Sequence, residues 1–215
     1  MSAKASRPWD ALFFDFDGVL VESVEVKTQA FAEIFKQYGR DIQDRVVAHH
    51  RDNGGMTRRE KFRHYYEFLL EKQLHDQELD QLCSRFAAIV FEKVIAAPEI
   101  PGAVDLLKEC KKKVPCFVIS GTPELELREI VERRGWTEYF VETCGAPDTK
   151  HDHLKRLLGN YALNPAHCIF FGDAFSDYQA ASESRIPFIG ILPNPEAPLL
   201  KAVPEIRWIR NFHDF

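Results

Sequence analysis

Residues 11–20 read ALFFDFDGVL, an apolar run that leads directly into two acids and a glycine. The run Ala11–Phe16 is short and strongly apolar, which predicts a buried β-strand. Asp15 and Asp17 therefore stand at the end of that strand. Acids at such places are often turn or helix-cap residues. Acids embedded in the apolar sequence LFFDFD are better explained by a function.

The sequence from about residue 100 onward alternates short apolar runs with helical segments. The predicted strands are Cys116–Ile119, Tyr139–Glu142, Cys168–Phe171, Phe188–Ile191 and Ile206–Ile209. The predicted helices fall between them, at about 102–113, 123–134, 151–159 and 175–184. Such alternation is typical of a parallel sheet with helices on both faces. We therefore predict an α/β fold, a doubly wound parallel sheet of the Rossmann-like kind.

Residues 20–99 have a different character, polar and helical in period. Three amphipathic patterns mark three helices: Phe31, Ile34, Phe35 and Tyr38, ending at Gly39; Phe62, Tyr65, Tyr66 and Leu69; and Leu79, Leu82, Phe86, Ile89 and Val90. Spacings of three and four place these side chains on one helix face, as core packing requires. We predict an α/β catalytic core of residues 1–19 and 100–215, with residues 20–99 inserted as an α-helical cap domain.

Composition and charge limit the kinds of partner that we expect. The chain has 215 residues and a net charge of −5, and a phosphate backbone selects a basic surface, so no nucleic acid partner is expected. No apolar stretch approaches the ~20 residues that cross a bilayer, so no membrane partner is expected either. The start, MSAKASRPWD, has no long apolar segment, which favours a cytoplasmic location. The five cysteines form no C-x-x-C pair and are expected to be reduced.

Polar side chains follow four of the predicted strands. In order along the chain they are Asp15, Asp17 and Gly18; Ser120, Gly121 and Thr122; Lys150; and Asp173 with Asp177. In parallel α/β sheets, ligands bind beyond the carboxyl ends of the strands. We therefore expect these groups to meet at one edge of the sheet.

The chemistry of this set is that of phosphoryl transfer. Crowded carboxylates are costly unless a cation neutralises them, and a few oxygen ligands with room for waters suit Mg²⁺. The Ser120 hydroxyl, the Gly121 amide and the Lys150 ammonium group are suited to phosphoryl oxygens. Asp15 is the predicted nucleophile, and Asp17, two residues on along a continuing strand, is the predicted general acid and base.

These segments resemble the four motifs of the haloacid dehalogenase-like superfamily, in its phosphatase and phosphomutase branch. The resemblance rests on DFDGVL at 15–20, SGT at 120–122, Lys150 and GDAFSD at 172–177. It implies Asp15 as nucleophile and metal ligand, the backbone carbonyl of Asp17 and the side chain of Asp173 as further metal ligands, and Asp177 as a supporting carboxylate. The implied function is a Mg²⁺-dependent phosphatase that hydrolyses a small phosphorylated metabolite, such as a sugar phosphate, through an aspartyl-phosphate.

Two other functions are open to such a set of residues. A phosphomutase similar to β-phosphoglucomutase uses the same phosphoenzyme, and the motifs do not separate it from a phosphatase. A signalling receiver domain also pairs an aspartate with a hydroxyl, a lysine and Mg²⁺, but such domains are shorter and have no cap. Dehalogenases and phosphonate hydrolases resemble this chain less, because they lack the acid at the position of Asp17.

The segment RDNGGMTRREK at 51–61 is the most informative part of the predicted cap. Thr57 and Glu60 have the spacing of a capping box, which predicts a helix that begins near Thr57. The part GMTRRE also resembles the glycine–hydroxyl–arginine cap loop of the superfamily's sugar phosphomutases and related phosphatases. We therefore expect Arg58, with Arg51 or Lys61 nearby, to bind a part of the substrate remote from the phosphoryl group. The histidines of the cap, His49, His50 and His64, are expected at the surface or as caps, like His151 and His153.

Overall fold

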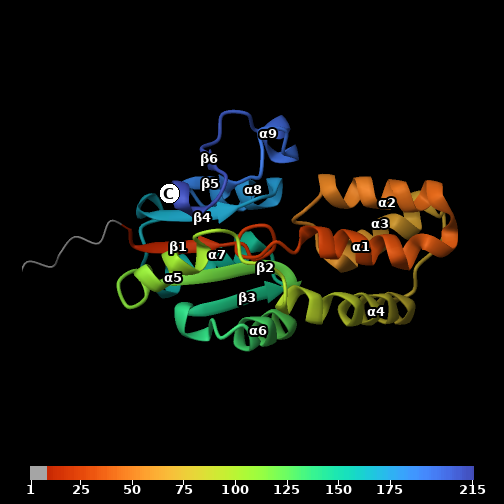
Figure 1. Cartoon of the computed structure of the whole chain (residues 1–215), viewed down its shortest axis with the longest axis horizontal. Helices are drawn as coiled ribbons and strands as arrows, with labels where there is room; N and C mark the ends of the chain where they lie inside the picture. The colour runs from red at the N-terminus through yellow and green to blue at the C-terminus, as the bar shows by residue number, and fades with distance from the viewer. Residues whose placement is uncertain (1–8) are drawn as a thin grey trace, which may run out of the picture.

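Six parallel strands form one sheet, in the order β3-β2-β1-β4-β5-β6 (Figure 1). They are β1 (Ala11–Phe14), β2 (Cys116–Pro123), β3 (Glu142–Ala146), β4 (Cys168–Gly172), β5 (Phe188–Ile191) and β6 (Trp208–Ile209). The structure, a computed structural model, describes residues 9–215, so the first eight residues of the predicted core and most of MSAKASRPWD lie outside it. β1 pairs with β2 and β4, and all four of its residues are buried. The predicted α/β fold with a doubly wound parallel sheet is confirmed.

Helices cover both faces of the sheet, and alternate residues of β1 point to the two faces. In the core, α5 (Ala103–Cys110) precedes β2. The helices that follow β2, β3, β4 and β5 are, in turn, α6 (Glu124–Arg133), α7 (Lys150–Asn160), α8 (Phe175–Glu183) and α9 (Pro198–Ala202). Leu12 and Phe14 belong to the same apolar cluster as the buried faces of α5 and α6. Phe13 belongs to the cluster formed with α7 and α8. A strand buried on both faces reads as a continuous apolar run, which explains the sequence ALFF.

The strand predictions need three corrections. Residues Thr137–Tyr139 form a 3₁₀ helix, not the start of a strand, and Val141 is exposed. The observed β3 instead uses small and polar buried residues, which give no apolar signal. The first strand ends at Phe14 rather than Phe16, and the last is only the pair Trp208–Ile209.

The segment between β1 and β2 is helical, and Figure 1 shows it as a separate group beyond the arrowheads of the sheet. We call these the inserted helices: α1 (Val24–Phe35), α2 (Arg40–Asp52), α3 (Arg58–His64) and α4 (Asp76–Ile95), with a π-helical turn at Tyr65–Leu69. Aromatic rings form their shared core. Phe31 lies 4.4 Å from Phe86 between ring centroids and 5.7 Å from Tyr65. The prediction that Phe62, Tyr65 and Tyr66 are core residues is confirmed.

The two chain segments that join the inserted helices to the sheet lie side by side. The Glu22 amide donates to the Pro98 carbonyl (2.9 Å), and the Ile100 amide donates to the Leu20 carbonyl (3.0 Å). All five cysteines carry unbridged thiols, as predicted. Within residues 9–215, none of the helices combines the length and the apolar character needed to span a bilayer.

Candidate active site

The polar groups that follow the strands meet at a cavity of about 60 Å³ between the carboxyl edge of the sheet and the inserted helices. The sheet side of this cavity is lined by six predicted site residues: Asp15, Asp17, Ser120, Gly121, Lys150 and Asp173. The inserted helices contribute Arg58 and Lys61. Asp177 and Arg51, which the sequence also placed at the site, do not line the cavity.

Lys150 joins two buried carboxylates at the base of the cavity. Its ammonium group lies 3.0 Å from Asp15 and also donates to Asp177. Burial alone lowers the pKa of a lysine, but Asp15 and Asp177 outweigh it and raise the pKa of Lys150. The second oxygen of Asp177 accepts from the backbone amides of Asp173 (3.2 Å) and Ala174 (3.1 Å). Asp177, which is fully buried, thus positions both Lys150 and the loop after β4.

Three carboxylates crowd together at this place. Oxygens of Asp15, Asp173 and Asp177 all lie within 4.8 Å of one another. Burial raises the pKa of Asp15 to about 7, although Lys150 opposes the shift. Burial, and then the charges of Asp15 and Asp177, raise the pKa of Asp173 well above its usual range. A divalent cation with oxygen ligands would relieve this repulsion, so the residues present fit Mg²⁺. Gly18 makes room for the cluster, since a Cβ there would lie 2.3 Å from Asp173 Oδ2.

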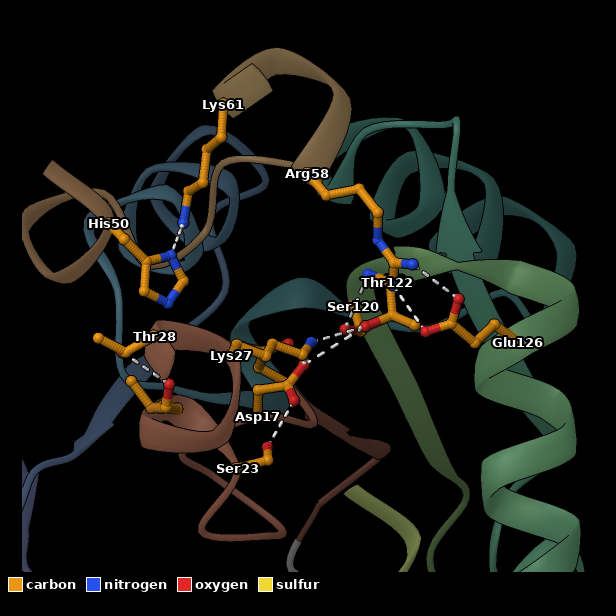
Figure 2. Close-up of polar contacts among 12 residues, drawn as sticks. Asp17, Ser23, Lys27, Thr28, His50, Arg58, Lys61, Ser120, Thr122 and Glu126 are labelled. Atoms are coloured by element: carbon orange, nitrogen blue, oxygen red, sulfur yellow. Dashed lines mark hydrogen bonds and ion pairs between the residues drawn. The ribbon is translucent and has the colours of Figure 1, made fainter. Parts of the chain in front are cut away.

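Asp17 lies beyond the end of β1, so the predicted sharing of one strand face with Asp15 does not apply. Its carboxylate accepts hydrogen bonds from the Ser23 hydroxyl and the Lys27 ammonium group (Figure 2). Lys27 also donates to the Thr122 hydroxyl (2.9 Å). Burial works to raise the pKa of Asp17, but Lys27 and the hydrogen bonds outweigh it and lower the pKa. The carboxylate of Asp17 is therefore ionised in this arrangement.

Ser120 and Gly121 lie within β2, at its carboxyl end. Ser120 does not cap the next helix, because α6 begins after Pro123 and has no side-chain cap. The Ser120 hydroxyl is buried and accepts from the Thr122 amide (3.2 Å). A Cβ on Gly121 would lie 3.5 Å from the carbonyl oxygen of Gly55 in the inserted segment. Gly121 therefore lies close to the inserted segment, at a distance that a Cβ would turn into ordinary van der Waals contact.

On the side of the inserted helices, the predicted capping box is confirmed. The Thr57 hydroxyl accepts from the Glu60 amide, and the Thr57 amide donates to the Glu60 carboxylate (2.8 Å). Arg58 begins α3 and is buried, but it forms two hydrogen bonds to Glu126 of α6, at 2.9 and 2.6 Å. Arg51 is half exposed and pairs with Glu25 (3.1 Å). Arg58 therefore has its charge compensated by the protein, and Arg51 points elsewhere.

Several site residues were missed by sequence reasoning. Lys27 of α1 and His50 of α2 both line the cavity, and His50 is buried rather than at the surface. His153 is also buried, contrary to expectation, with its Nε2 2.9 Å from the Gly145 carbonyl oxygen. No sequence motif contains Lys27 or His50, because their position depends on how the inserted helices pack over the sheet. Thr122 was visible as part of SGT, but nothing indicated its contact with Lys27.

Comparison with known proteins identifies the family and several relatives of this chain. The haloacid dehalogenase-like hydrolase family matches residues 9–185. Validoxylamine A 7'-phosphate phosphatase of Streptomyces hygroscopicus subsp. limoneus is 27% identical over 210 residues, which cover 91% of this chain and 94% of that protein. Phosphoglycolate phosphatase of Synechococcus elongatus is 23% identical and covers 91% and 90%. The solved β-phosphoglucomutase of Clostridium difficile superposes with a TM-score of 0.77 at 16% identity, covering 96% of this chain and 93% of that one.

The structural likeness at such low identity shows a shared fold. The family match shows more, because it extends from β1 through the loop after β4 to the end of α8 and so includes all four polar segments. This chain therefore belongs to the haloacid dehalogenase-like hydrolases.

Proposed function

We propose that this phosphoric monoester hydrolase is a Mg²⁺-dependent phosphatase of small phosphorylated metabolites, with Asp15 as its nucleophile. One observation carries the proposal: Lys150 holds Asp15 at 3.0 Å at the base of a small cavity, beside Ser120 and Asp173. A carboxylate next to a buried ammonium group and a buried hydroxyl suits attack on a phosphoryl group whose oxygens those donors bind. The named phosphatases among the relatives support the same reaction class.

The reaction divides into two displacements at phosphorus. An Asp15 oxygen attacks the phosphorus, the bond to the substrate oxygen breaks, and Asp17 gives that oxygen a proton. Asp17 then takes a proton from water, which attacks the aspartyl-phosphate and releases inorganic phosphate and Asp15. Because the carboxylate of Asp17 is ionised beside Lys27, its role as acid requires that it first leave Lys27 and take up a proton from water. Ser120, the Gly121 amide and Lys150 bind the phosphoryl oxygens throughout.

Mg²⁺ would be held by the side chains of Asp15 and Asp173 and by the backbone carbonyl of Asp17. When bound, it would neutralise part of the charge of the phosphoryl group and of the crowded acids. The raised pKa values of Asp15 and Asp173 support this ligand set. They show that the single charge of Lys150 does not offset the burial and crowding of these carboxyl groups, as a divalent cation would. Asp177 supports the site from outside, through Lys150 and the amides of the loop.

We also propose that residues 20–99 act as a cap over a core of residues 1–19 and 100–215. The two connecting segments around Glu22 and Pro98 support this division. They are hydrogen-bonded to each other, and they are the places where the chain leaves the sheet for the inserted helices and returns to it. The cavity lies between the two parts. A cap of this kind excludes water from the phosphoryl group and contacts the rest of the substrate.

The test is phosphate release from a panel of phosphomonoesters by the purified protein with Mg²⁺. We expect multiple turnovers on small substrates. A single turnover that leaves a stable phosphoprotein would instead support a receiver-type role. Transfer of the phosphoryl group to another hydroxyl of the same sugar, without release of phosphate, would support a phosphomutase. No reaction with any phosphomonoester would overturn the proposal.

A further inference from the structure

Lys61 is a buried cation without a carboxylate partner. Its side chain lines the active-site cavity, and the residue is only 1% exposed. No carboxylate oxygen of residues 9–215 lies within 4 Å of its ammonium group. The other cations that line the cavity each have one: Lys27 has Asp17, Arg58 has Glu126, and Lys150 has Asp15. Burial, and then the charge of Lys27, lower the pKa of Lys61 to about 7. An uncompensated charge of this kind is costly to bury.

The ammonium group of Lys61 has one hydrogen-bond partner in the described chain, His50, at 2.6 Å from the ammonium nitrogen to Nδ1. Burial, and then Lys61 and Lys27, lower the pKa of His50 to about 3, so the ring is neutral. Because Nδ1 accepts from Lys61, the ring proton lies on Nε2. Nε2 is buried and makes no hydrogen bond within residues 9–215. The Val24 carbonyl, which works to raise the pKa of His50, is the nearest acceptor for this nitrogen and also accepts from the Thr28 hydroxyl (2.9 Å).

We propose that Lys61 and His50 form a carboxylate-binding subsite on the cap side of the cavity. This rests on the proposed phosphatase function and narrows it to phosphomonoesters that carry a carboxylate remote from the phosphoryl group. The subsite offers the remaining N–H groups of Lys61, which are donors, and His50 holds Lys61 in place through its Nδ1. A carboxylate only accepts hydrogen bonds, whereas a sugar hydroxyl also brings a donor that would find no acceptor there. One lysine balances one negative charge, which favours a carboxylate over a second phosphoryl group.

The placement of Arg58 explains why Lys61, and not Arg58, takes this role. The two residues are three apart on α3 and therefore face the same side of the helix. Figure 2 shows both side chains descending from this helix, Arg58 toward Glu126 and Lys61 toward His50. The Arg58–Glu126 pair fixes α3 against α6. It thereby positions Lys61, about one turn further along α3, at the cavity that Asp17 and Lys27 also line.

The relatives alone do not decide the substrate class. A validoxylamine phosphate presents hydroxyl groups, and phosphoglycolate presents a carboxylate. The donor-only character of the Lys61 ammonium group is the feature that separates the two classes for this chain.

The experiment measures binding of two inert phosphonates by calorimetry, with Mg²⁺ present. Phosphonoacetate carries a carboxylate, and propylphosphonate does not. We expect the wild-type protein to bind phosphonoacetate at least about tenfold more tightly. Lys61→Met should abolish this preference and leave the affinity for propylphosphonate within about threefold. His50→Asn should reduce the preference in part. Arg63→Met, on the exposed side of the same helix, should retain it.

The outcomes separate this proposal from the phosphatase proposal, because phosphonates bind without turnover. Equal affinity of the wild-type protein for both ligands overturns the subsite, even where phosphate release has been observed. An equal loss of both affinities in Lys61→Met overturns it too, since Lys61 would then act on the phosphoryl site. Tighter binding of methylenediphosphonate than of phosphonoacetate would overturn the choice of a carboxylate. If the wild-type protein prefers phosphonoacetate but releases no phosphate from any ester, the subsite is supported and the phosphatase function is overturned.

Discussion

Asp15 and Lys150 form the contact on which the proposed chemistry depends, and each is buried. Asp15→Asn keeps the shape of the side chain but removes the nucleophilic oxygen. We expect kcat to fall by at least about a hundredfold, with little change in the melting temperature, because an amide still accepts from Lys150. Phosphate release and thermal unfolding check both parts. Asp105→Asn, an exposed acid on α5, is the control. More than about a hundredth of the wild-type kcat would favour direct attack by water.

Lys61 should affect the pH dependence of stability. Its pKa falls from 10.5 to about 7 on folding. Between these values the unfolded chain binds a proton that the folded chain does not, so stability decreases as the pH falls from about 10 to 7. Below pH 7 Lys61 is protonated in both states, so the folded protein bears the whole free-energy cost of burying its charge. At ~1.4 kcal/mol per pKa unit the upper limit is about 5 kcal/mol, and structural relaxation reduces it to about 2 kcal/mol.

Lys61→Met removes this cost. Relative to wild type, the variant should gain about 2 kcal/mol more free energy of unfolding at pH 6 than at pH 10. Urea titrations of the metal-free proteins at both values measure the difference. Arg63→Met, which removes an exposed charge, should show no such trend. A constant difference between Lys61→Met and wild type across this range would mean that Lys61 is charged throughout, with a partner not apparent in this arrangement.

At the scale of elements, the pair Arg58–Glu126 joins α3 to α6, with side chains 6% and 14% exposed. Glu126→Gln leaves a buried guanidinium group without its counter-charge, and we expect a loss of about 1–3 kcal/mol in the free energy of unfolding. Arg58→Met in the same background should restore part of it. The exposed pair Arg133–Glu92 also joins α6 to an inserted helix, so Glu92→Gln is the matched control and should change little. A loss no larger in Glu126→Gln than in that control would contradict a structural role for the buried pair.

The elements differ in how well the sequence predicts them. ALFF and CIFF are buried on both faces, and their continuous apolar runs identify β1 and β4. The capping box at Thr57 is equally local and places the start of α3. β3 was misplaced, because Thr143 and Cys144 fill its buried positions while the exposed Val141 looks like a strand residue. Local pattern fails where a small or polar residue is buried by its neighbours.

The same distinction holds for the site and the molecule as a whole. Asp15, Ser120, Lys150 and Asp173 follow strands of one parallel sheet, so topology alone brings them to one edge. The contacts that cross from the inserted helices obey no such rule. Glu126 takes the charge of Arg58, and His50 meets Lys61, because four helices pack over the sheet in one particular way. The sequence therefore predicts the reaction class better than the substrate, since the substrate is chosen by those contacts.

Mg²⁺ should couple chemistry to the stability of the whole molecule. Asp15, Asp173 and Asp177 repel one another in the metal-free protein, and a bound cation stabilises the folded state that creates this cluster. At a Mg²⁺ concentration about a hundred times Kd, the gain is about 2.7 kcal/mol, or a rise of about 5–10 °C in Tm for a chain of this size. Excess chelator should abolish phosphate release, and added Mg²⁺ should restore both activity and Tm. Asp173→Asn should lose the Mg²⁺-dependent rise in Tm, whereas Asp105→Asn should keep it. Full activity in excess chelator would remove the metal from the mechanism, and an undiminished rise in Asp173→Asn would place the cation elsewhere.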